Sequence, residues 1–200
     1  MILSSPRFKA VIAAIDGANA GDPRQEFASG VSRPREVLYS ERMSEVLAQI
    51  YPGASEALRI AAHAQHICRW QIARGDYPLG RDGYNAWRAA CREHHARLIT
   101  GILNRSGYAE HEIAHVAKII RKEDLKRDAD SQALENVVGV VFVAHYLEAF
   151  IAAHPDYDEE KLAGILRQTL RKMDATGHAA VSRFALPART ERMIAIALKK

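Results

Sequence analysis

The chain has 200 residues, of which 48% are hydrophobic and 26% are charged, and it carries a net charge of +4. This length and mixture predict one soluble globular domain and exclude a collagen, a mucin stalk and a disordered tail. Two cysteines are too few for a disulfide framework, and the first residues lack the apolar core of a signal peptide, so a cytoplasmic protein is expected.

Helical periodicity runs through the whole chain, and no stretch alternates convincingly between polar and apolar residues as a strand does. The first helix is expected over about 6–20, with Ser5 as its N-cap and Pro6 in its first turn, and a polar loop then runs to Pro34. Further helices are expected over about 35–50, 55–74, 84–105, 109–122, 131–154, 158–173 and 190–198.

The expected helix over 131–154 is apolar on all sides, which is typical of a helix at the centre of a bundle. Its longest apolar run, 137–144, is too short to cross a bilayer, so no membrane partner is predicted. The predicted fold class is therefore all-α, a single helical bundle over residues 1–200.

The segment 59–105 is rich in arginine: it holds eight arginines, no lysine and three acids, and four of the nine histidines. A guanidinium group has the planar fork that suits phosphate or carboxylate. One stripe of the expected helix over 55–74 carries Arg59, His63, His66, Trp70 and Arg74. Two histidines one turn apart fit metal ligation, and a pair of hydrogen-bonded core histidines is the alternative.

Three further polar residues are expected in the interior of the bundle. His94 and His95 flank the buried face of the helix over 84–105, either as ligands or as a hydrogen-bonded interfacial pair, whereas Glu93 and Arg97 look like an exposed ion pair. Glu135 lies inside the apolar helix, where a carboxylate needs a metal, a cation or a set of donors. The alternative for Glu135 is an internal ion pair with an arginine. Gly139 beside it leaves room for an approaching group.

Between the expected helices over 55–74 and 84–105, arginines alternate with aromatic residues. Arg74, Arg81 and Arg88 recur every seven residues, and so do Trp70, Tyr77 and Tyr84. Such a surface suits a phosphorylated, stackable ligand such as a nucleotide, and it would also suit single-stranded nucleic acid.

The residues 111–115 match H-E-x-x-H, the signature of zinc proteases. His111 and His115 lie opposite the apolar face of their expected helix, so both are predicted to face water, whereas a catalytic zinc needs an enclosed cleft. We therefore reject a protease. Lys122 and Lys126 are expected in a solvated charged turn, and the segment 171–178, with Lys172 and His178, is expected to end a helix.

Four runs of sequence, AQHICRW, YPLGRDGYNAWR, LENVVGVVFVAHYLEAF and LRQTLRKMDATGH, resemble a bacterial and fungal family catalogued as domain of unknown function 4202. The resemblance covers nearly the whole chain. Members are sometimes labelled glutamyl-tRNA synthetase, but no Rossmann-type strand–loop–helix pattern is present to support that label. The family pattern reads Asp where this chain has Asn136. It matches His66, Trp70, Arg74, Tyr77, Arg81, Tyr84, Trp87, Arg88, His95, Lys122, Glu135, Lys172 and His178.

A more remote similarity is to the HD superfamily of metal-dependent phosphohydrolases, which are helical bundles. Those enzymes carry a His on one helix, a His-Asp pair on the next and an Asp on a later central helix. The order of His66, the pair at 94–95 and Glu135 is similar and implies an HD-like helix order. This chain has no His-Asp dipeptide, and the later Asp would fall near Val138.

The function expected from these residues is a metal-assisted phosphohydrolase acting on a small phosphorylated or nucleotide ligand. In this hypothesis His66, His95 and Glu135 hold a divalent metal ion, for which Mn, Fe, Zn and Mg all remain open. Glu135 and Lys122 are the expected catalytic residues. The expected ligand-binding residues are Arg74, Arg81, Arg88, Trp70, Tyr77 and Tyr84.

Two other functions stay open at this stage. One is a metal-free binding module for an anionic ligand or a partner protein, which the broken HD spacing favours. The other is single-stranded nucleic-acid binding through the arginine-rich loop, and a homodimer is compatible with either.

Overall fold

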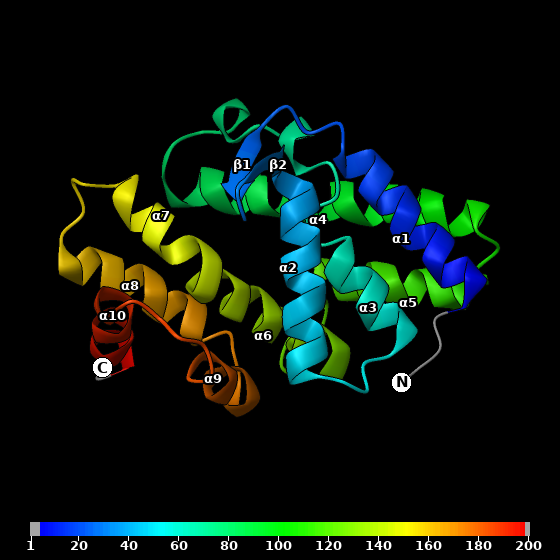
Figure 1. Ribbon diagram of the computed structural model, residues 1–200. Helices are drawn as coiled ribbons and strands as arrows, with labels where there is room; N and C mark the ends of the chain where they lie inside the picture. The colour runs from blue at the N-terminus through cyan, green and yellow to red at the C-terminus, as the bar shows by residue number, and fades with distance from the viewer. Residues whose placement is uncertain (1–4, 199–200) are drawn as a thin grey trace.

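The computed structural model describes residues 5–198, and across them ten α-helices and one two-stranded hairpin form an all-α fold (Figure 1). The predicted fold class is thus confirmed. The elements are α1 (Pro6–Asn19), β1 (Gln25–Ala28), β2 (Val31–Pro34), α2 (Arg35–Ile50), α3 (Glu56–His63), α4 (Gly80–Arg105), α5 (Glu110–Arg121), α6 (Ala129–Val141), α7 (Leu147–Ala152), α8 (Glu159–Leu170), α9 (Ala175–Val181) and α10 (Ala188–Leu198).

The first two helices begin and end close to where the sequence predicts them. The Ser5 hydroxyl caps α1 by accepting from the Phe8 amide at 3.1 Å, and α2 occupies the predicted residues 35–50. Between them, the expected polar loop is wrong in part, because β1 and β2 pair antiparallel. Ser29 and Gly30 both have positive φ, at 51° and 83°, which is the backbone that a two-residue hairpin turn needs.

The helix expected over 55–74 stops after His63, so its second half is wrong. The chain turns instead, with Cys68 at a φ of 50°. The Cys68 amide donates at 2.9 Å to the side chain of Asn19, which is fully buried at the end of α1. This bond to another helix replaces the helical bond, and the predicted stripe from Arg59 to Arg74 does not form.

The long apolar helix is the central element, as predicted. It consists of α6, a π-helical segment over Phe142–Tyr146 and α7, and Figure 1 shows it running from behind α2 to the upper left, above α8. Among the described residues, the stretch Ala129–Ala152 alone is long and apolar enough to span a membrane by composition. Of its most apolar window, 56% is buried against the rest of the protein, including α2, α5 and α9.

The C-terminal part contains a helix that the sequence did not predict. Asp174 caps α9 by accepting from the amides of Thr176 and Gly177, where only the end of the previous helix was expected. The preceding Met173 fills the space beside Gly139: a Cβ atom there would lie 2.4 Å from the Met173 sulfur. Gly139 thus serves close packing of α6 and leaves no room for a ligand.

We predict that Asn19→Ala lowers the free energy of unfolding by about 1–3 kcal/mol, because it leaves buried donors and acceptors without partners. The Asn19 amide donates to the Ser40 hydroxyl at 3.0 Å as well as accepting from Cys68. Urea denaturation measures the change. Asn104→Ala, at an exposed position of α4, is the control and should change stability by less than about 0.5 kcal/mol.

Candidate functional site

A cluster of charged and aromatic side chains lies buried where α2, α4, α5 and α6 meet. We call it the histidine cluster, after the two rings at its centre. Four helices and the turn after α3 contribute to it, so residues far apart in sequence converge. Its members are Glu36, Tyr39, His66, Arg69, Arg88, His95, Lys122 and Glu135.

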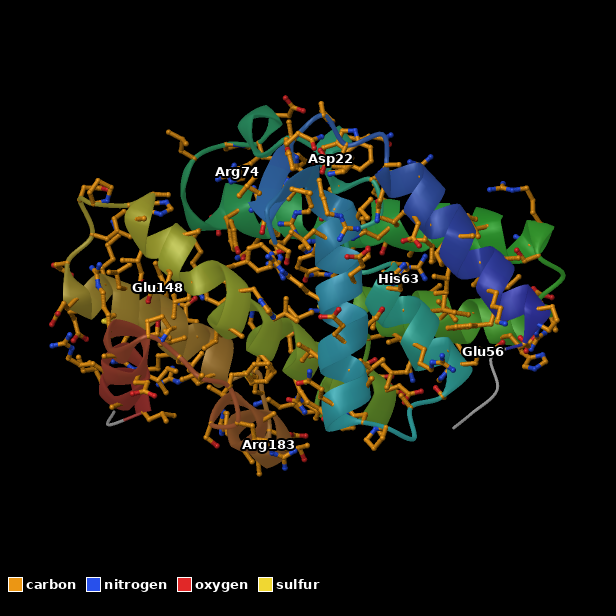
Figure 2. All side chains as sticks on the ribbon, viewed as in Figure 1. Asp22, Glu56, His63, Arg74, Glu148 and Arg183 are labelled. Atoms are coloured by element: carbon orange, nitrogen blue, oxygen red, sulfur yellow. The ribbon has the colours of Figure 1, made fainter. Side chains whose placement is uncertain are left out.

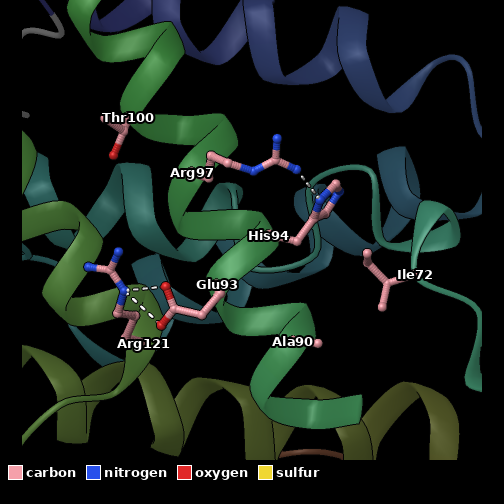
Figure 3. Close-up of a pocket in the computed structure, with 7 residues that line it drawn as sticks. All are labelled: Ile72, Ala90, Glu93, His94, Arg97, Thr100 and Arg121. Atoms are coloured by element: carbon pink, nitrogen blue, oxygen red, sulfur yellow. Dashed lines mark hydrogen bonds and ion pairs between the residues drawn. The ribbon is translucent and has the colours of Figure 1, made fainter. Parts of the chain in front are cut away.

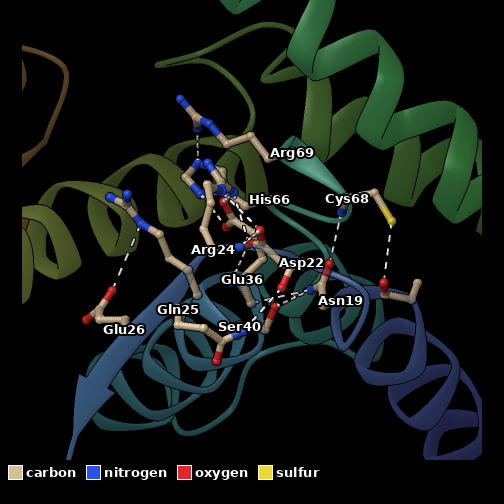
Figure 4. Close-up of polar contacts among 12 residues, drawn as sticks. Asn19, Asp22, Arg24, Gln25, Glu26, Glu36, Ser40, His66, Cys68 and Arg69 are labelled. Atoms are coloured by element: carbon tan, nitrogen blue, oxygen red, sulfur yellow. Dashed lines mark hydrogen bonds and ion pairs between the residues drawn. The ribbon is translucent and has the colours of Figure 1, made fainter. Parts of the chain in front are cut away.

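His66 lies in the turn after α3 and is held on three sides. Its ring stacks on Tyr39, with 3.8 Å between ring centres and 11° between planes. Its Nδ1 lies 3.3 Å from a Glu36 carboxylate oxygen, and its Nε2 is hydrogen-bonded to the Arg69 guanidinium (Figure 4). Burial, reinforced by the positive charge of Arg69, lowers the pKa of His66 well below its usual value. The ring is therefore neutral at physiological pH.

His95, on α4, is the most buried ionisable ring of the cluster, with 2% of its surface exposed. Its ring centre lies 5.9 Å from that of His66. Burial and the nearby charge of Arg69 lower the pKa of His95 well below its usual value. Within residues 5–198 neither of its ring nitrogens has a hydrogen-bond partner. Buried polar atoms in native proteins are nearly always paired, so these two nitrogens point to a bound group.

Lys122 and Glu135 form a buried ion pair across the α5–α6 connection. Their side chains are 7% and 9% exposed, so the expectation of a solvated turn at Lys122 is wrong. The expected internal ion pair of Glu135 exists, but with this lysine and not with an arginine. Burial alone would raise the pKa of Glu135, but the charge and hydrogen bond of Lys122 outweigh it and hold that pKa below its usual value. Burial lowers the pKa of Lys122, with Arg88 acting in the same direction.

The residues predicted to hold a metal ion do not fit one in this arrangement. Both ring nitrogens of His66 face other side chains, and the Glu135 carboxylate is taken by Lys122. Across the part of the chain that the structure describes, no group of three or more His, Cys, Asp or Glu side chains could hold a metal ion. We therefore derive no chemistry through a metal.

Three members of the cluster, Glu36, Tyr39 and Arg69, are not among the site residues predicted from the sequence. Glu36 is 3% exposed and receives the Arg24 guanidinium at 2.6 Å, while Arg24 also binds the buried Asp22 at 2.9 Å (Figure 4). A signal existed, because Glu36 and Tyr39 share the face of α2 that carries buried Met43. Including these side chains, the cations outnumber the carboxylates: Arg24, Arg69, Arg88, Lys122 and Lys172 act on Asp22, Glu36 and Glu135.

The arginine-rich loop is not the single binding surface that the heptad spacing predicts. Arg74, labelled on the loop in Figure 2, donates to the carbonyls of Tyr77 and Pro78 at 2.9 and 3.0 Å and so shapes the loop itself. Arg88 instead acts electrostatically on His66, His95, Lys122 and Glu135. Arg81 and Tyr84 are exposed, whereas Trp70, Tyr77 and Trp87 are partly buried.

His94 points away from the cluster, into a separate open depression of about 630 Å³ (Figure 3). Its Nδ1 lies 3.1 Å from the Arg97 guanidinium, and Glu93 binds Arg121 at 3.0 Å. The predicted Glu93–Arg97 pair is therefore wrong: the two residues have different partners. The adjacent residues His94 and His95 therefore lie in two different environments.

The H-E-x-x-H motif forms no metal site. His111 is exposed as predicted, and His115, which is partly buried, lies 3.0 Å from Asp130. Glu112 binds Arg7 and the Ala109 amide. At the other end of the chain, His178 bonds the Leu170 carbonyl at 2.8 Å, and Lys172 is exposed while its charge acts on Glu135.

Comparison with known families gives one match. The sequence model described as "Domain of unknown function (DUF4202)" matches residues 9–194. No curated protein and no solved structure matches the chain. Nothing in these comparisons supports a relation to the HD superfamily or an HD-like helix order.

We predict that Lys122→Met lowers the free energy of unfolding by about 3–5 kcal/mol, because it leaves the Glu135 carboxylate buried without its partner. The double variant Lys122→Met/Glu135→Leu should recover most of that loss, since both charges are then gone. Urea denaturation of Lys122→Met, Glu135→Leu and the double variant completes this double-mutant cycle. A cost below about 1 kcal/mol for the single variants would contradict a buried charged pair.

Purified protein should carry well under one equivalent of Mn, Fe, Zn or Mg per chain, because no three-ligand group is preassembled among the described residues. Elemental analysis by mass spectrometry measures this after purification without chelator. One equivalent of a single metal, lost in a His66→Ala variant, would restore the metal site expected from the sequence.

Proposed function

The chain belongs to the family described as Domain of unknown function (DUF4202), and we propose that it binds a small phosphate-bearing anion at the histidine cluster without a metal ion. The observation that carries this proposal is His95. Its ring is buried, neutral and without partners for both nitrogens, and it lies among positive side chains. A neutral imidazole offers one N–H donor and one acceptor, so it can hydrogen-bond a phosphate oxygen through one nitrogen and a hydroxyl through the other.

The charge around His95 supports an anionic ligand. Arg69 is nearly buried, and its pKa is lowered by burial and then by the charge of Arg88. Arg88 is half-buried, and its guanidinium lies 3.5 Å from the hydroxyl of exposed Tyr84. Two guanidinium groups that repel each other are stabilised by an anion between them. Guanidinium is also the side chain best shaped to bind phosphate through two parallel hydrogen bonds.

Tyr146 adds a group for the rest of the ligand. Its hydroxyl interacts with Arg42, and its ring lies 5.0 Å from the Arg42 guanidinium and 5.8 Å from the Tyr39 ring. It belongs to the π-helical segment, and such segments occur frequently at functional sites. A hydroxyl or a ring of the ligand is the chemistry that these aromatic groups fit.

The metal-assisted phosphohydrolase expected from the sequence is less favoured by this geometry. Its nucleophile would be a metal-bound water, and the Lys122–Glu135 pair takes the carboxylate that such a metal would need. Nucleic-acid binding through the loop is less favoured too, because Arg74 is engaged with the loop carbonyls. Binding of an anion without a metal is the function that the contacts support best.

Phosphate should raise the melting temperature of the protein in a thermal-shift assay, and Arg88→Gln should abolish most of this shift. A ligand that binds only the folded state stabilises it by mass action. A charge-assisted hydrogen bond contributes about 1.5–3 kcal/mol, so the dissociation constant should rise by tenfold or more. Phosphate, sulfate and nucleoside monophosphates are the probes, with chloride at equal ionic strength as the reference.

Arg105→Gln is the matched control, since Arg105 ends the same helix and is exposed. It should respond to phosphate as the unaltered protein does. If no phosphorylated compound shifts the melting temperature, or if both variants respond alike, the anion site is wrong.

A further inference from the structure

A second group of side chains, outside the histidine cluster, is arranged for a different chemistry. Ser44 on α2, His63 at the end of α3 and Asp16 on α1 form one hydrogen-bonded line. The Ser44 hydroxyl lies 2.8 Å from Nδ1 of His63, and Nε2 of His63 lies 2.7 Å from an Asp16 carboxylate oxygen. Figure 2 labels His63 at the end of α3, between α2 and α1 in that view.

The direction of the two hydrogen bonds follows from the chemistry of the partners. A carboxylate oxygen only accepts, so Nε2 of His63 carries the proton and donates to Asp16. In the neutral ring Nδ1 is then the acceptor, and the Ser44 hydroxyl donates to it. This is the tautomer that a general base needs, because its lone pair faces the hydroxyl proton.

The serine and the histidine line a cavity. Its volume is about 360 Å³, and most of its wall is apolar, formed by Phe8, Ile12, Leu47, Ala48, Tyr51, Pro52 and Ala54. Arg59, one turn before His63 on α3, also lines it, with its guanidinium 4.3 Å from the centre of the Phe8 ring. Glu41 and Glu45 of α2 line the cavity as well, and Glu41 is paired with Arg33 at 2.5 Å. A hydrogen-bonded serine at the edge of a mostly apolar cavity has the parts of an acyl-transfer site.

This cavity is separate from the histidine cluster. Ser44 is five residues after Tyr39 on α2, which turns it by about 140° around the helix axis from the face that meets His66. None of the cluster residues lines the cavity. The two sites therefore use different faces of the same helix, and the inference does not depend on anion binding.

We propose that Ser44 is a nucleophile that accepts the acyl group of a small ester with an apolar acyl chain. The Ser44 oxygen attacks the carbonyl carbon while its proton passes to Nδ1 of His63, and Asp16 stabilises the resulting imidazolium. The bond to the leaving alkoxide then breaks, and the alkoxide takes the proton from His63. Water repeats the sequence on the acyl-serine, which returns the serine and releases the carboxylic acid.

The walls of the cavity define the substrate class. Its apolar side chains suit an acyl chain of a few carbons, and 360 Å³ leaves no space for a long one. The alcohol part of the ester would extend towards solvent.

The test is labelling of the full chain with a fluorophosphonate, which reacts with activated serines, followed by peptide mass spectrometry. The expected result is one adduct, on Ser44, and hydrolysis of p-nitrophenyl butyrate that is lost in Ser44→Ala. Asp16→Asn should slow both reactions by about a hundredfold, because it removes the group that orients His63. Ser182→Ala, at an exposed serine on the far end of the chain, should behave as the unaltered protein.

Labelling of the unaltered protein decides the question even if a variant fails to fold. The absence of an adduct on Ser44 would overturn the proposal. An adduct on Ser44 that forms at the same rate in folded Asp16→Asn would overturn the catalytic role of the Ser44–His63–Asp16 hydrogen bonds. These bonds would then only hold the three helices together. Circular dichroism of each variant establishes that it is folded.

Discussion

The centre of this bundle depends on keeping charged side chains buried where its helices cross. Lys122 follows the last residue of α5 with a φ of 59°, and this left-handed turn marks the point where α5 ends on the way to α6. There it pairs with Glu135, which the apolar helix α6 could not bury alone. The same pair is neutral as a whole, so within the histidine cluster Arg69 and Arg88 face the single carboxylate of Glu36, and this excess of positive charge defines the candidate anion site.

The hydrogen bonds that stabilise the fold also position the side chains of the candidate binding site. Asn19 holds the turn after α3, and this turn places His66 against Tyr39 and Arg69 against His66. The polar groups of the cluster are therefore positioned by hydrogen bonds from other helices, not by the local helix. Such preorganised groups bind a ligand at a lower entropic cost than mobile surface side chains do.

Much of the fold could be predicted from the sequence, because 35–50 shows a clear helical periodicity with one apolar face and 131–154 is apolar on all sides, as a central helix is. The hairpin was missed since four-residue strands are too short to display an alternation. The end of α3 at His63 was missed because the bond that stops the helix comes from Asn19, 49 residues away in sequence. Local propensity carries no information on such a contact.

For the candidate site, the sequence predicts which residues take part but not the contacts they make. His66, Arg88, His95, Lys122 and Glu135 were all named from the sequence, and the structure brings them together. Their roles could not be read from the sequence, since a lysine among acids looks solvated until its side chain is found against Glu135. The loop residues Arg74 and Arg81 shared a spacing with Arg88 but not its surroundings, because spacing predicts a common face only where the chain stays helical.

Nitrogen NMR of the protein labelled in its histidine rings tests the central claim most directly. Titration with phosphate should move the two ring nitrogens of His95 and leave those of exposed His111 unchanged, and Arg88→Gln should abolish the change at His95. If phosphate binds while both nitrogens of His95 keep their resonance positions, the anion lies elsewhere and the account of the histidine cluster is wrong.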